Sequence, residues 1–246
     1  MTVTGNRLLD CAPEEVRAAL LAEARCVHIP LGHALSRAHA VPRNVFFPVG
    51  VVAAQMVTTE EAEAVAVGLL GVEDVANCFA LLGHRTSSAR CVAVTAGASY
   101  CIPLERMRQL FERDSAVRAL ILDHLQYQLA IHDQISACNR LHGIDQRLAM
   151  WLLSLADQLG SQTFAMTQMA LSSILGVQRS SLNLAAAALK TGGLIDYRRG
   201  RLWIQDREGL IGRACSCYSA SQRLVRQLHK TEARELSNPA AWAERR

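Results

Sequence analysis

The sequence contains no run of 18 consecutive apolar residues, only six prolines and 15 glycines, and only 5% aromatic residues among its 246 positions. The missing apolar run excludes a helix that crosses a membrane, and residues 1–10 lack the basic start and apolar stretch of a secretory leader. Low-complexity and collagen-like chains need more Gly and Pro than this. Half of the residues are hydrophobic and 20% are charged, which is typical of a globular protein with a substantial core. We therefore expect a cytoplasmic protein with no membrane partner.

Neither sign of charge dominates the sequence. It has 26 Lys or Arg residues and 22 Asp or Glu residues, which gives a net charge of +4. Residues 213–246 hold seven basic and three acidic residues, so the excess lies in this segment alone. A chain with such a weak overall field binds nucleic acid through local basic patches rather than through its total charge.

The eight cysteines are scattered along the chain. Because no secretion signal accompanies them, we expect reduced thiols rather than a disulfide framework. Cys215 and Cys217 form the one close pair, and a packing role is favoured there over a redox or metal role. The sequence assigns no metal ligands and no cofactor.

Residues 1–112 are expected to form a β-rich domain that begins with a helix. Pro13-Glu14-Glu15 opens an amphipathic segment that extends to residue 24. From residue 26 to 103, short runs rich in Val and Ala alternate with breaks at Gly, Pro and polar clusters. The clearest runs are Val51–Thr58, Ala64–Leu70, Cys91–Thr95 and Ser99–Ile102. Short strands separated by turns are typical of a sandwich or a barrel.

Residues 104–141 contain neither Gly nor Pro and predict one long helix. The stripe that recurs at threes and fours consists of Val117, Leu120, Ile121, Leu125, Gln128, Ile131, Ile135 and Cys138. Together with Gln128, His124 and His132 interrupt its apolar character, so the helix is amphipathic. Long helices of this kind often pair two chains, with a polar residue setting the register. We assign residues 113–142 to a dimerisation helix, with packing on its own domain as the alternative.

Residues 143–212 have the order of a winged helix-turn-helix domain. Helices are expected over residues 144–159, 168–175 and 179–191, followed by a hairpin over residues 194–204. Thr167 is the expected N-cap of the second helix, and Gly160 and Gly176 follow the first two helices as C-caps. Residues 213–246 are expected to form a basic C-terminal tail with a short helix at 222–236.

The second helix of such a motif enters the major groove, with its N-terminal residues against base edges. Arg179 can donate two hydrogen bonds to a guanine, and Gln178 or Asn183 can read an adenine. Thr167 and Gln168 can hold a phosphate at the start of the preceding helix. Arginines at the hairpin tip can hold the flanking backbone, although a merely solvated turn is the alternative. The predicted DNA-binding residues are Thr167, Gln168, Gln178, Arg179, Ser180, Ser181, Asn183, Arg198, Arg199 and Arg201.

Several motifs along the chain carry a resemblance to a known family. In the last third they are Thr167-Gln168-Met169-Ala170, Ser173-Ile174-Leu175-Gly176-Val177-Gln178-Arg179-Ser180-Ser181-Leu182, Leu189-Lys190-x-Gly192-Gly193-Leu194-Ile195, Arg199-Gly200-Arg201-Leu202 and Asp206-x-Glu208-Gly209-Leu210. In the first third they are Asn6-Arg7-Leu8-Leu9, Phe47-Pro48-x-Gly50-Val51-Val52, Gly68-x-x-Gly71 and Leu81-Leu82-Gly83. These motifs, spread over residues 6–218, resemble the cyclic-AMP receptor protein/FNR (Crp/Fnr) family of bacterial transcription regulators.

The resemblance implies an α+β fold with an N-terminal jelly-roll-like β-roll of the cyclic-nucleotide-binding type, a long dimerisation helix and a winged helix-turn-helix. The family's recognition contacts fall on Gln178, Arg179, Ser180 and Leu184. The arginine matches, whereas Ser180 and Leu184 replace a glutamate and a second arginine. Because a carboxylate reads cytosine and an arginine reads guanine, we expect an operator that differs from the familiar one.

The sensor positions depart further from the family pattern. Val75-Ala76 replaces the Gly-Glu pair that binds a ribose, and Ser88-Ala89 replaces the Arg-Ser or Arg-Thr pair that binds the phosphate. Arg85 and Arg90 could supply a guanidinium under a shifted alignment. A cyclic nucleotide without these partners would be poorly paired in a buried site, so the chain resembles a branch without the cyclic-nucleotide signature.

Other chemistry has weaker support. An iron–sulfur cluster of the FNR type needs a tight cysteine group, and Cys11 and Cys26 are far apart. Haem could use Cys78, His84 or His28 as an axial ligand, but a lone residue of this kind is more often simply packed. A cupin-like enzyme needs a His-x-His spacing that His28, His33 and His39 do not have. We expect no enzyme.

The sequence thus predicts a transcription regulator that reads a near-palindromic DNA operator as a homodimer and is not controlled by cyclic AMP. The alternatives are a constitutive DNA-binding or protein-interaction module with a vestigial sensor pocket, or a redox- or haem-responsive sensor. The expected partners are double-stranded DNA and a second copy of the chain. RNA polymerase joins them if the protein is an activator, and a small-molecule effector, if one exists, is not identified by the sequence.

Overall fold

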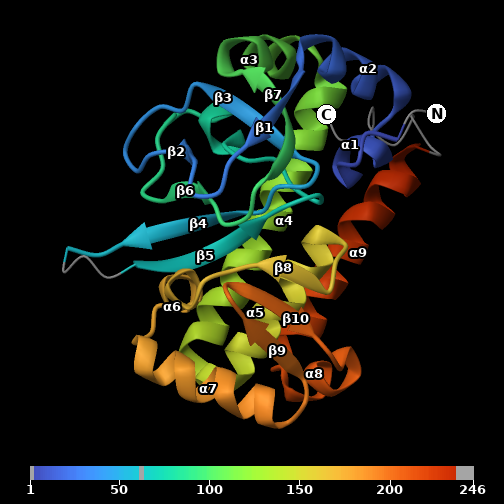
Figure 1. Cartoon of the computed structure of the whole chain (residues 1–246). Coiled ribbons are helices and arrows are strands. Elements are labelled where there is room, and N and C mark those ends of the chain that lie inside the picture. The colour runs from blue at the N-terminus through green and yellow to red at the C-terminus, as the bar shows by residue number, and fades with distance from the viewer. Residues whose placement is uncertain (1–2, 61–63, 237–246) are drawn as a thin grey trace.

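A β-roll of two antiparallel sheets forms the N-terminal part of the molecule in the computed structural model, which describes residues 3–60 and 64–236, with side chains up to residue 228 (Figure 1). One sheet has the order β1 (Arg25–Ile29), β7 (Gly97–Pro103) and β3 (Asn44–Pro48). The other has the order β2 (Ala34–Ser36), β6 (Arg90–Ala93), β4 (Ala53–Thr58) and β5 (Ala64–Leu70). The predicted β-roll architecture is confirmed, and each of the four clearest predicted runs overlaps a strand.

Short helices close the ends of the β-roll. They are α1 (Arg7–Cys11), α2 (Glu14–Glu23), the 3-10 helix η1 (Cys78–Leu81) and α3 (Leu104–Arg113). The Asn6 side chain caps α1 by accepting a hydrogen bond from the Leu9 N–H, and its own amide donates to the carbonyls of Pro48 and Asp74. A buried cap that also joins two distant loops fixes where the chain enters the fold.

The prediction of one continuous helix over residues 104–141 is wrong, because the chain breaks between α3 and α4 (Ser115–Leu141). Asp114 has extended backbone angles, and its carboxylate accepts hydrogen bonds from the N–H groups of Ala116 and Val117. A side chain that satisfies free amides in this way starts a new helix. Asp is also among the weaker helix formers, which favours a break at this residue.

The predicted stripe of α4 faces the chain itself rather than a partner. Val117, Leu120 and Ile121 pack in one core with residues of β3, β7 and α3. Farther along the helix, Ile135 and Cys138 enter a second core that contains α5. The alternative expected from the sequence, packing on its own domain, therefore applies to this face of α4.

The winged helix-turn-helix has the elements that the sequence predicts. They are α5 (Ile144–Leu159), α6 (Gln168–Leu175), α7 (Arg179–Thr191), β9 (Ile195–Arg198) and β10 (Arg201–Ile204), and the structure adds β8 (Thr163–Ala165) and α8 (Arg207–Arg213). Gly160 and Gly176 are left-handed C-caps with φ of 60° and 62°, as expected. The sequence did not predict β8, which pairs with β10 and turns the hairpin into a three-stranded sheet of order β8-β10-β9.

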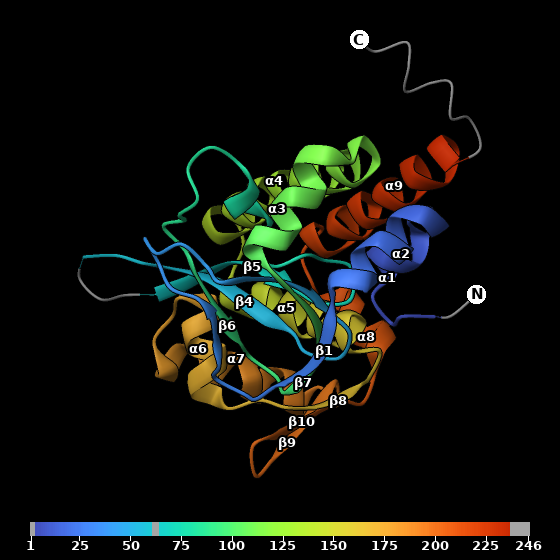
Figure 2. The same cartoon turned by 90° about the horizontal axis from the view of Figure 1, so that it is seen from above.

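The segment predicted as a basic tail contains a long helix, α9 (Cys217–Leu236), which begins five residues before the expected helix at 222–236. It lies alongside α4 (Figure 2). The Gln134 amide contacts Cys217, whereas Leu228 shares a core with Tyr127, so the two helices run antiparallel. The last ten residues of the predicted tail, 237–246, lie outside the described residues.

The β-roll and the winged domain share one hydrophobic core. Met56 and Ala66 of the four-stranded sheet pack in the same cluster as Trp151 of α5 and Leu171 of α6. Gly176 sits so close to β5 that a Cβ at this position would lie 2.9 Å from Val65. Among the described helices, none has the length and apolar composition that a membrane-spanning segment needs.

Candidate nucleic-acid interface

Helix α7 has one buried face and one exposed face. Leu182, Ala185 and Leu189 are buried against α5 and the hairpin, and their spacing of three and four is that of an amphipathic helix. At the start of the helix, Gln178, Arg179, Ser180 and Asn183 are exposed, and Ser181 is half-buried. The polar residues that the sequence selects for base contacts thus stand at the N-terminal end of a helix anchored by its opposite side.

The start of α6 has the cap that the sequence predicts. The Thr167 hydroxyl accepts a hydrogen bond from the Ala170 N–H at 3.1 Å, and Thr167 itself is exposed. Gln168, the first residue of the helix, is half-buried. The remaining free amides of this helix end can interact with an anion such as a DNA phosphate.

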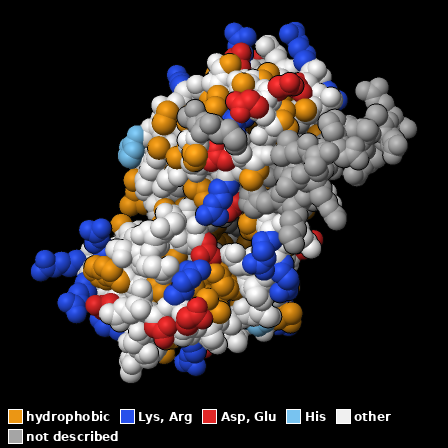
Figure 3. All heavy atoms as spheres, turned by 90° about the vertical axis from the view of Figure 1, so that its right-hand side faces the viewer, with side chains coloured by type: hydrophobic (Ala, Val, Ile, Leu, Met, Phe, Trp, Pro, Cys, Tyr) orange, Lys and Arg blue, Asp and Glu red, His pale blue; other side chains and the backbone are white. Residues whose placement is uncertain are grey.

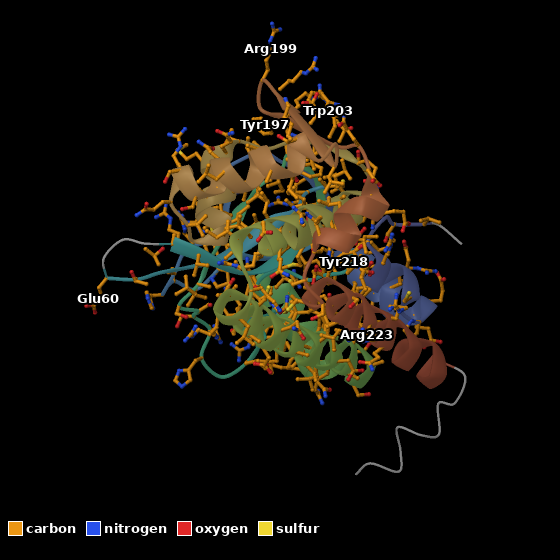
Figure 4. The ribbon with its side chains drawn as sticks, turned by 90° about the horizontal axis from the view of Figure 1, so that it is seen from below. Glu60, Tyr197, Arg199, Trp203, Tyr218 and Arg223 are labelled. Carbon is orange, nitrogen blue, oxygen red and sulfur yellow. The ribbon has the colours of Figure 1, made fainter. Side chains whose placement is uncertain are left out.

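The hairpin between β9 and β10 carries three arginines at its tip. Arg198 pairs with Arg201 in the sheet, and the two residues between them, Arg199 and Gly200, have φ of 49° and 78°. Positive φ at both central residues defines a tight turn that matches the twist of the strands. Figure 4 shows Arg199 at the end of this turn, pointing away from the body of the molecule. The wing therefore presents a cation at its outermost point.

One acidic residue organises the base of the wing. The Asp196 carboxylate pairs with Lys190 Nζ at 2.7 Å and with Arg198 Nε at 3.0 Å. The hydrogen bond from Lys190 lowers the pKa of Asp196, and the nearby Arg198 lowers it further. The Tyr197 hydroxyl donates to the Met166 carbonyl at 2.7 Å, which joins the wing to the start of α6. Arg198 is thus partly engaged within the chain, whereas Arg199 and Arg201 have no ion pair among the described residues.

Basic side chains also lie on the side of the molecule formed by α8 and α9. Figure 3 shows Lys and Arg side chains spread over the winged-domain half of this face, with acidic groups among them. Because acidic side chains lie among the basic ones, this face carries no continuous basic patch in the view of Figure 3.

Two exposed apolar residues accompany the polar ones. Leu184 is 76% exposed on α7, and Met169 is 64% exposed on α6. The sequence pointed to Leu184 only through the family resemblance and missed Met169. The sequence did contain a signal for both residues, because neither falls on the apolar stripe of its helix that faces the core. An exposed apolar group on a recognition helix can contact a thymine methyl.

The segment that the family resemblance aligns with a ribose-binding pair, Val75-Ala76, is enclosed. Val75 and Ala76 have no exposed surface, and the Val75 N–H donates to His124 Nε2 at 3.0 Å. The Val75 carbonyl accepts from the amide of Gln128 and from the thiol of Cys78 at 3.4 Å each. Burial lowers the pKa of His124 to about 4, so the ring is neutral at pH 7.

The carboxylates next to this segment are engaged elsewhere. Glu73 forms an ion pair with Arg7, and Asp74 accepts a hydrogen bond from the Gly71 N–H at 2.9 Å. Burial raises the pKa of Asp74 to about 8, with the neighbouring Glu73 adding to the shift. A neutral, internally bonded carboxyl is poorly suited to bind a ribose hydroxyl as a carboxylate does.

The other side chains considered for sensing are dispersed. The histidines at positions 28, 33, 39 and 84 are all exposed. Cys78 is buried, and burial raises the pKa of its thiol to about 12. In the part of the chain that the structure describes, none of these residues belongs to a group that could hold a metal ion. Ser88 and Arg90 are exposed, and Ala89 and Arg85 are half-buried, so no buried guanidinium faces the enclosed segment from these positions.

Comparison with known proteins identifies the C-terminal domain. Residues 146–213 match the family model of the Crp-like helix-turn-helix domain. No curated protein matches the sequence. These residues contain α6, α7 and the wing, and so all ten of the predicted DNA-binding positions.

Solved structures share the fold over about four fifths of this chain. A transcriptional regulator of the Crp/Fnr family from Eubacterium rectale has a TM-score of 0.65 at 14% identity, over 84% of this chain and 96% of that one. FixK2 from Bradyrhizobium japonicum has a TM-score of 0.66 at 13% identity, over 78% and 98%. The c-di-GMP-responsive global regulator CLP from Xanthomonas campestris has a TM-score of 0.64 at 14% identity, over 79% and 100%. The β-roll, long helix and winged domain thus recur together in these proteins.

Proposed function

We propose that this chain, which has a Crp-like helix-turn-helix domain and the fold of the Crp/Fnr regulators, is a transcription regulator that binds a specific DNA sequence as a homodimer. The observation that carries the proposal is the exposed N-terminal end of α7, whose opposite apolar face is buried in the domain. The exposed polar side chains at this end are those of Gln178, Arg179, Ser180 and Asn183. Such an end is the part of a helix-turn-helix that contacts base edges.

The proposed contacts divide into two kinds. Arg179, Gln178 and Asn183 read bases in the major groove, and Ser180 and Ser181 contact bases or backbone beside them. Phosphates are held by Thr167 and Gln168 at the start of α6, and by Arg198, Arg199 and Arg201 in the wing. Because phosphate contacts carry no sequence information, specificity depends on the first group.

The homodimer is proposed to use the outer face of α4. Exposed Leu122, Gln126, Leu129, Asp133 and Ser136 recur at alternating spacings of four and three, which is the spacing of a two-helix seam. Leu122 is 45% and Leu129 is 65% exposed, so two apolar side chains one heptad apart are available to a partner. A two-fold dimer presents its recognition helices to half-sites roughly 34 Å apart, and the operator is therefore near-palindromic.

Control by cyclic AMP is not part of the proposal. Val75 and Ala76 are buried, and both backbone groups of Val75 are bonded within the chain. This observation favours the second candidate function, a constitutive DNA-binding module whose sensor position has been closed by α4. Catalysis is not proposed, and contact with RNA polymerase applies only if the protein activates transcription.

The test is a selection from random duplexes, followed by fluorescence-anisotropy titration at two salt concentrations with and without cyclic AMP. We expect a near-palindromic consensus, salt-sensitive binding and no response to the nucleotide. Arg179→Ala should weaken specific binding about 10- to 100-fold, equivalent to roughly 1–3 kcal/mol. Arg113→Ala, at an exposed position at the end of α3, is the matched control. Absence of any selected sequence, or equal loss in both variants, would contradict the proposal.

The dimer is tested separately by sedimentation velocity. Leu129→Lys should convert the dimer to a monomer and weaken operator binding, because a charge would face its own copy across the seam. Leu31→Lys places the same charge at another exposed leucine, in the β-roll, and should leave the dimer intact. A wild-type protein that is monomeric at all accessible concentrations and still binds the full operator would exclude this seam.

A further inference from the structure

Three cysteines and one histidine from distant parts of the sequence come together at the end of α4. Cys138 lies in the last turn of this helix, and His142 follows it as the C-cap residue. Four residues along a helix is one turn, so both side chains lie on the same side. Cys215 lies in the short connection between α8 and α9 and Cys217 is the first residue of α9, more than 70 residues later. The fold of the described chain thus assembles a Cys3His group that neither segment holds alone.

The four side chains are close enough to share one ion. The sulfurs of Cys138 and Cys215 are 3.5 Å apart, and Cys217 Sγ is 3.5 Å from His142 Nδ1. All four candidate ligand atoms lie within 4.8 Å of one another. Tetrahedral zinc, with Zn–S bonds of about 2.3 Å and Zn–N bonds of about 2.0 Å, separates two sulfurs by about 3.8 Å and a sulfur from a nitrogen by about 3.5 Å.

We propose that Cys138, His142, Cys215 and Cys217 form a structural zinc site. Three thiolates and an imidazole are a donor set that selects zinc over the hard cations, which take oxygen ligands. Four protein ligands leave no position for a substrate or water, and this is the property that separates structural sites from catalytic ones. The three cysteines are at most 4% exposed, and His142 is half-buried, so the site is shielded while one edge stays accessible to the ion.

The surroundings of the group suit a bound zinc ion with three thiolates. Such a complex has a net charge of −1, and Arg147 lies near enough to Cys138 and Cys215 to interact electrostatically with both. Arg147 is only 7% exposed, and its Nε has no hydrogen-bond partner among the described residues. A buried cation beside an anionic complex offsets the cost of burying each of them alone.

A second outer contact is made by α4 itself. The Gln134 side-chain amide donates to Cys217 Sγ at 3.0 Å. Hydrogen bonds from outer groups orient metal ligands and stabilise the charge on a thiolate. Gln134 and Arg147 therefore supply the donor and the positive charge that a zinc–thiolate group requires.

The position of the group indicates what the zinc ion would do. It lies between the end of α4 and the start of α5 at Ile144, where the long helix meets the winged domain, and it also holds the start of α9. A bound ion would tie α9 back onto α4 and fix the angle at which the winged domain leaves the long helix. Cys215 and Cys217, to which the sequence assigned a packing role, would have this structural role instead.

The experiment uses the full-length protein, purified under reducing conditions without chelators. Elemental analysis should find one zinc ion per chain. Replacement by cobalt should give thiolate-to-metal charge-transfer bands and the intense visible bands of a tetrahedral ion. Zinc added to the apoprotein should raise its melting temperature.

Four variants distinguish ligation from packing. Cys217→Ser and His142→Ala should lower zinc affinity by at least about 100-fold, and Gln134→Ala by about 10- to 100-fold. Cys217→His keeps a ligand at the position and should retain zinc even where the serine variant does not. Cys26→Ser and His33→Ala alter exposed residues in the β-roll and are the matched controls, which should bind zinc as the wild type does.

Two results would overturn the proposal. One is a full-length protein that takes up neither zinc nor cobalt while its circular dichroism shows it to be folded. The other is a disulfide between Cys138 and Cys215, identified by peptide mass spectrometry, that persists under reductant and zinc. A folded Cys217→Ser variant with wild-type zinc affinity would likewise remove Cys217 from the site.

Discussion

The exposed end of α7 and the enclosed segment around Val75 differ in whether their polar groups are hydrogen-bonded within the chain. On α7, Arg179 and Asn183 point away from a buried apolar face and are exposed. Around Val75, the backbone N–H and carbonyl are both bonded to side chains of the same chain, from His124 and Gln128. Hydrogen-bonding groups left exposed on a rigid helix are available to a partner, whereas groups satisfied internally stabilise the fold. The polar end of α7 is thus open to a partner, whereas the polar backbone groups around Val75 are not.

The largest expected effect is on the free energy of unfolding, and it distinguishes the buried face of α7 from its exposed face. Leu182 is fully buried and Leu184 is 76% exposed, two residues apart on the same helix. Leu182→Ala should lower the free energy of unfolding by about 2–5 kcal/mol, because it leaves a cavity. Leu184→Ala should change it by less than about 0.5 kcal/mol and alter DNA affinity instead. Urea denaturation and anisotropy measure the two quantities, and equal destabilisation by both variants would contradict the described orientation of α7.

The enclosed segment can be probed through pH. Because the folded-state pKa of His124 is about 4 against 6.5 unfolded, unfolding takes up a proton between these values. The neutral ring therefore contributes stability that is present above pH 6.5 and is lost as the pH falls towards 4. At pH 5 the low pKa of His124 lowers the free energy of unfolding by about 2 kcal/mol, and replacing this histidine by a residue that does not titrate removes that loss.

The measurement is the difference in unfolding free energy between His124→Gln and the wild type as a function of pH. We expect the variant to gain relative to the wild type as the pH falls from 7 to 5. Asp74, with its raised pKa of about 8, shifts stability in the opposite direction, but it is present in both proteins and cancels in the difference. A pH-independent difference would mean that His124 is hydrated in solution and that the segment is open.

The contact between the helix-turn-helix and the β-roll can be tested with two glycines. Gly176 and Gly193 have φ of 62° and 70°, so alanine at either position costs about 1–2 kcal/mol of backbone strain. Only at Gly176 would the new Cβ also meet Val65 of β5, at 2.9 Å, whereas at Gly193 it would meet no atom within 4 Å. Gly176→Ala should therefore lower the melting temperature more than Gly193→Ala. Equal losses would show that the turn does not pack on β5 in solution.

The smallest expected effect concerns the wing. Arg199 stands at the outermost point of the hairpin and has no ion pair among the described residues. If it contacts one phosphate, Arg199→Ala should reduce the slope of log affinity against log salt by about 0.9, with little change in sequence preference. Arg113→Ala should leave the slope unchanged. A changed consensus sequence would instead assign Arg199 to base reading.

Much of the winged domain could be predicted because its signals are local. Thr167 caps α6, and Gly160 and Gly176 end their helices in the left-handed conformation, as their positions in the sequence indicated. The break at Asp114 was missed because a cap inside an otherwise helical composition is a weak signal. The pairing of β8 with β10 was missed for a different reason, since a three-residue strand is defined by its partner and not by its own pattern.

The sequence by itself determined the order of the β-rich part, the long helix and the winged domain, and with it the polar end of α7 and the basic wing, since these depend on caps, turns and periodicity within a few residues. The tertiary structure alone decided which face of α4 is buried, where α9 packs and that Cys138 and His142 meet Cys215 and Cys217. A periodic stripe predicts that a helix face is covered but not by what, because its own domain and a second chain offer the same apolar contact. Contacts between residues more than 70 positions apart leave no local pattern, and only the packing of the whole chain brings them together.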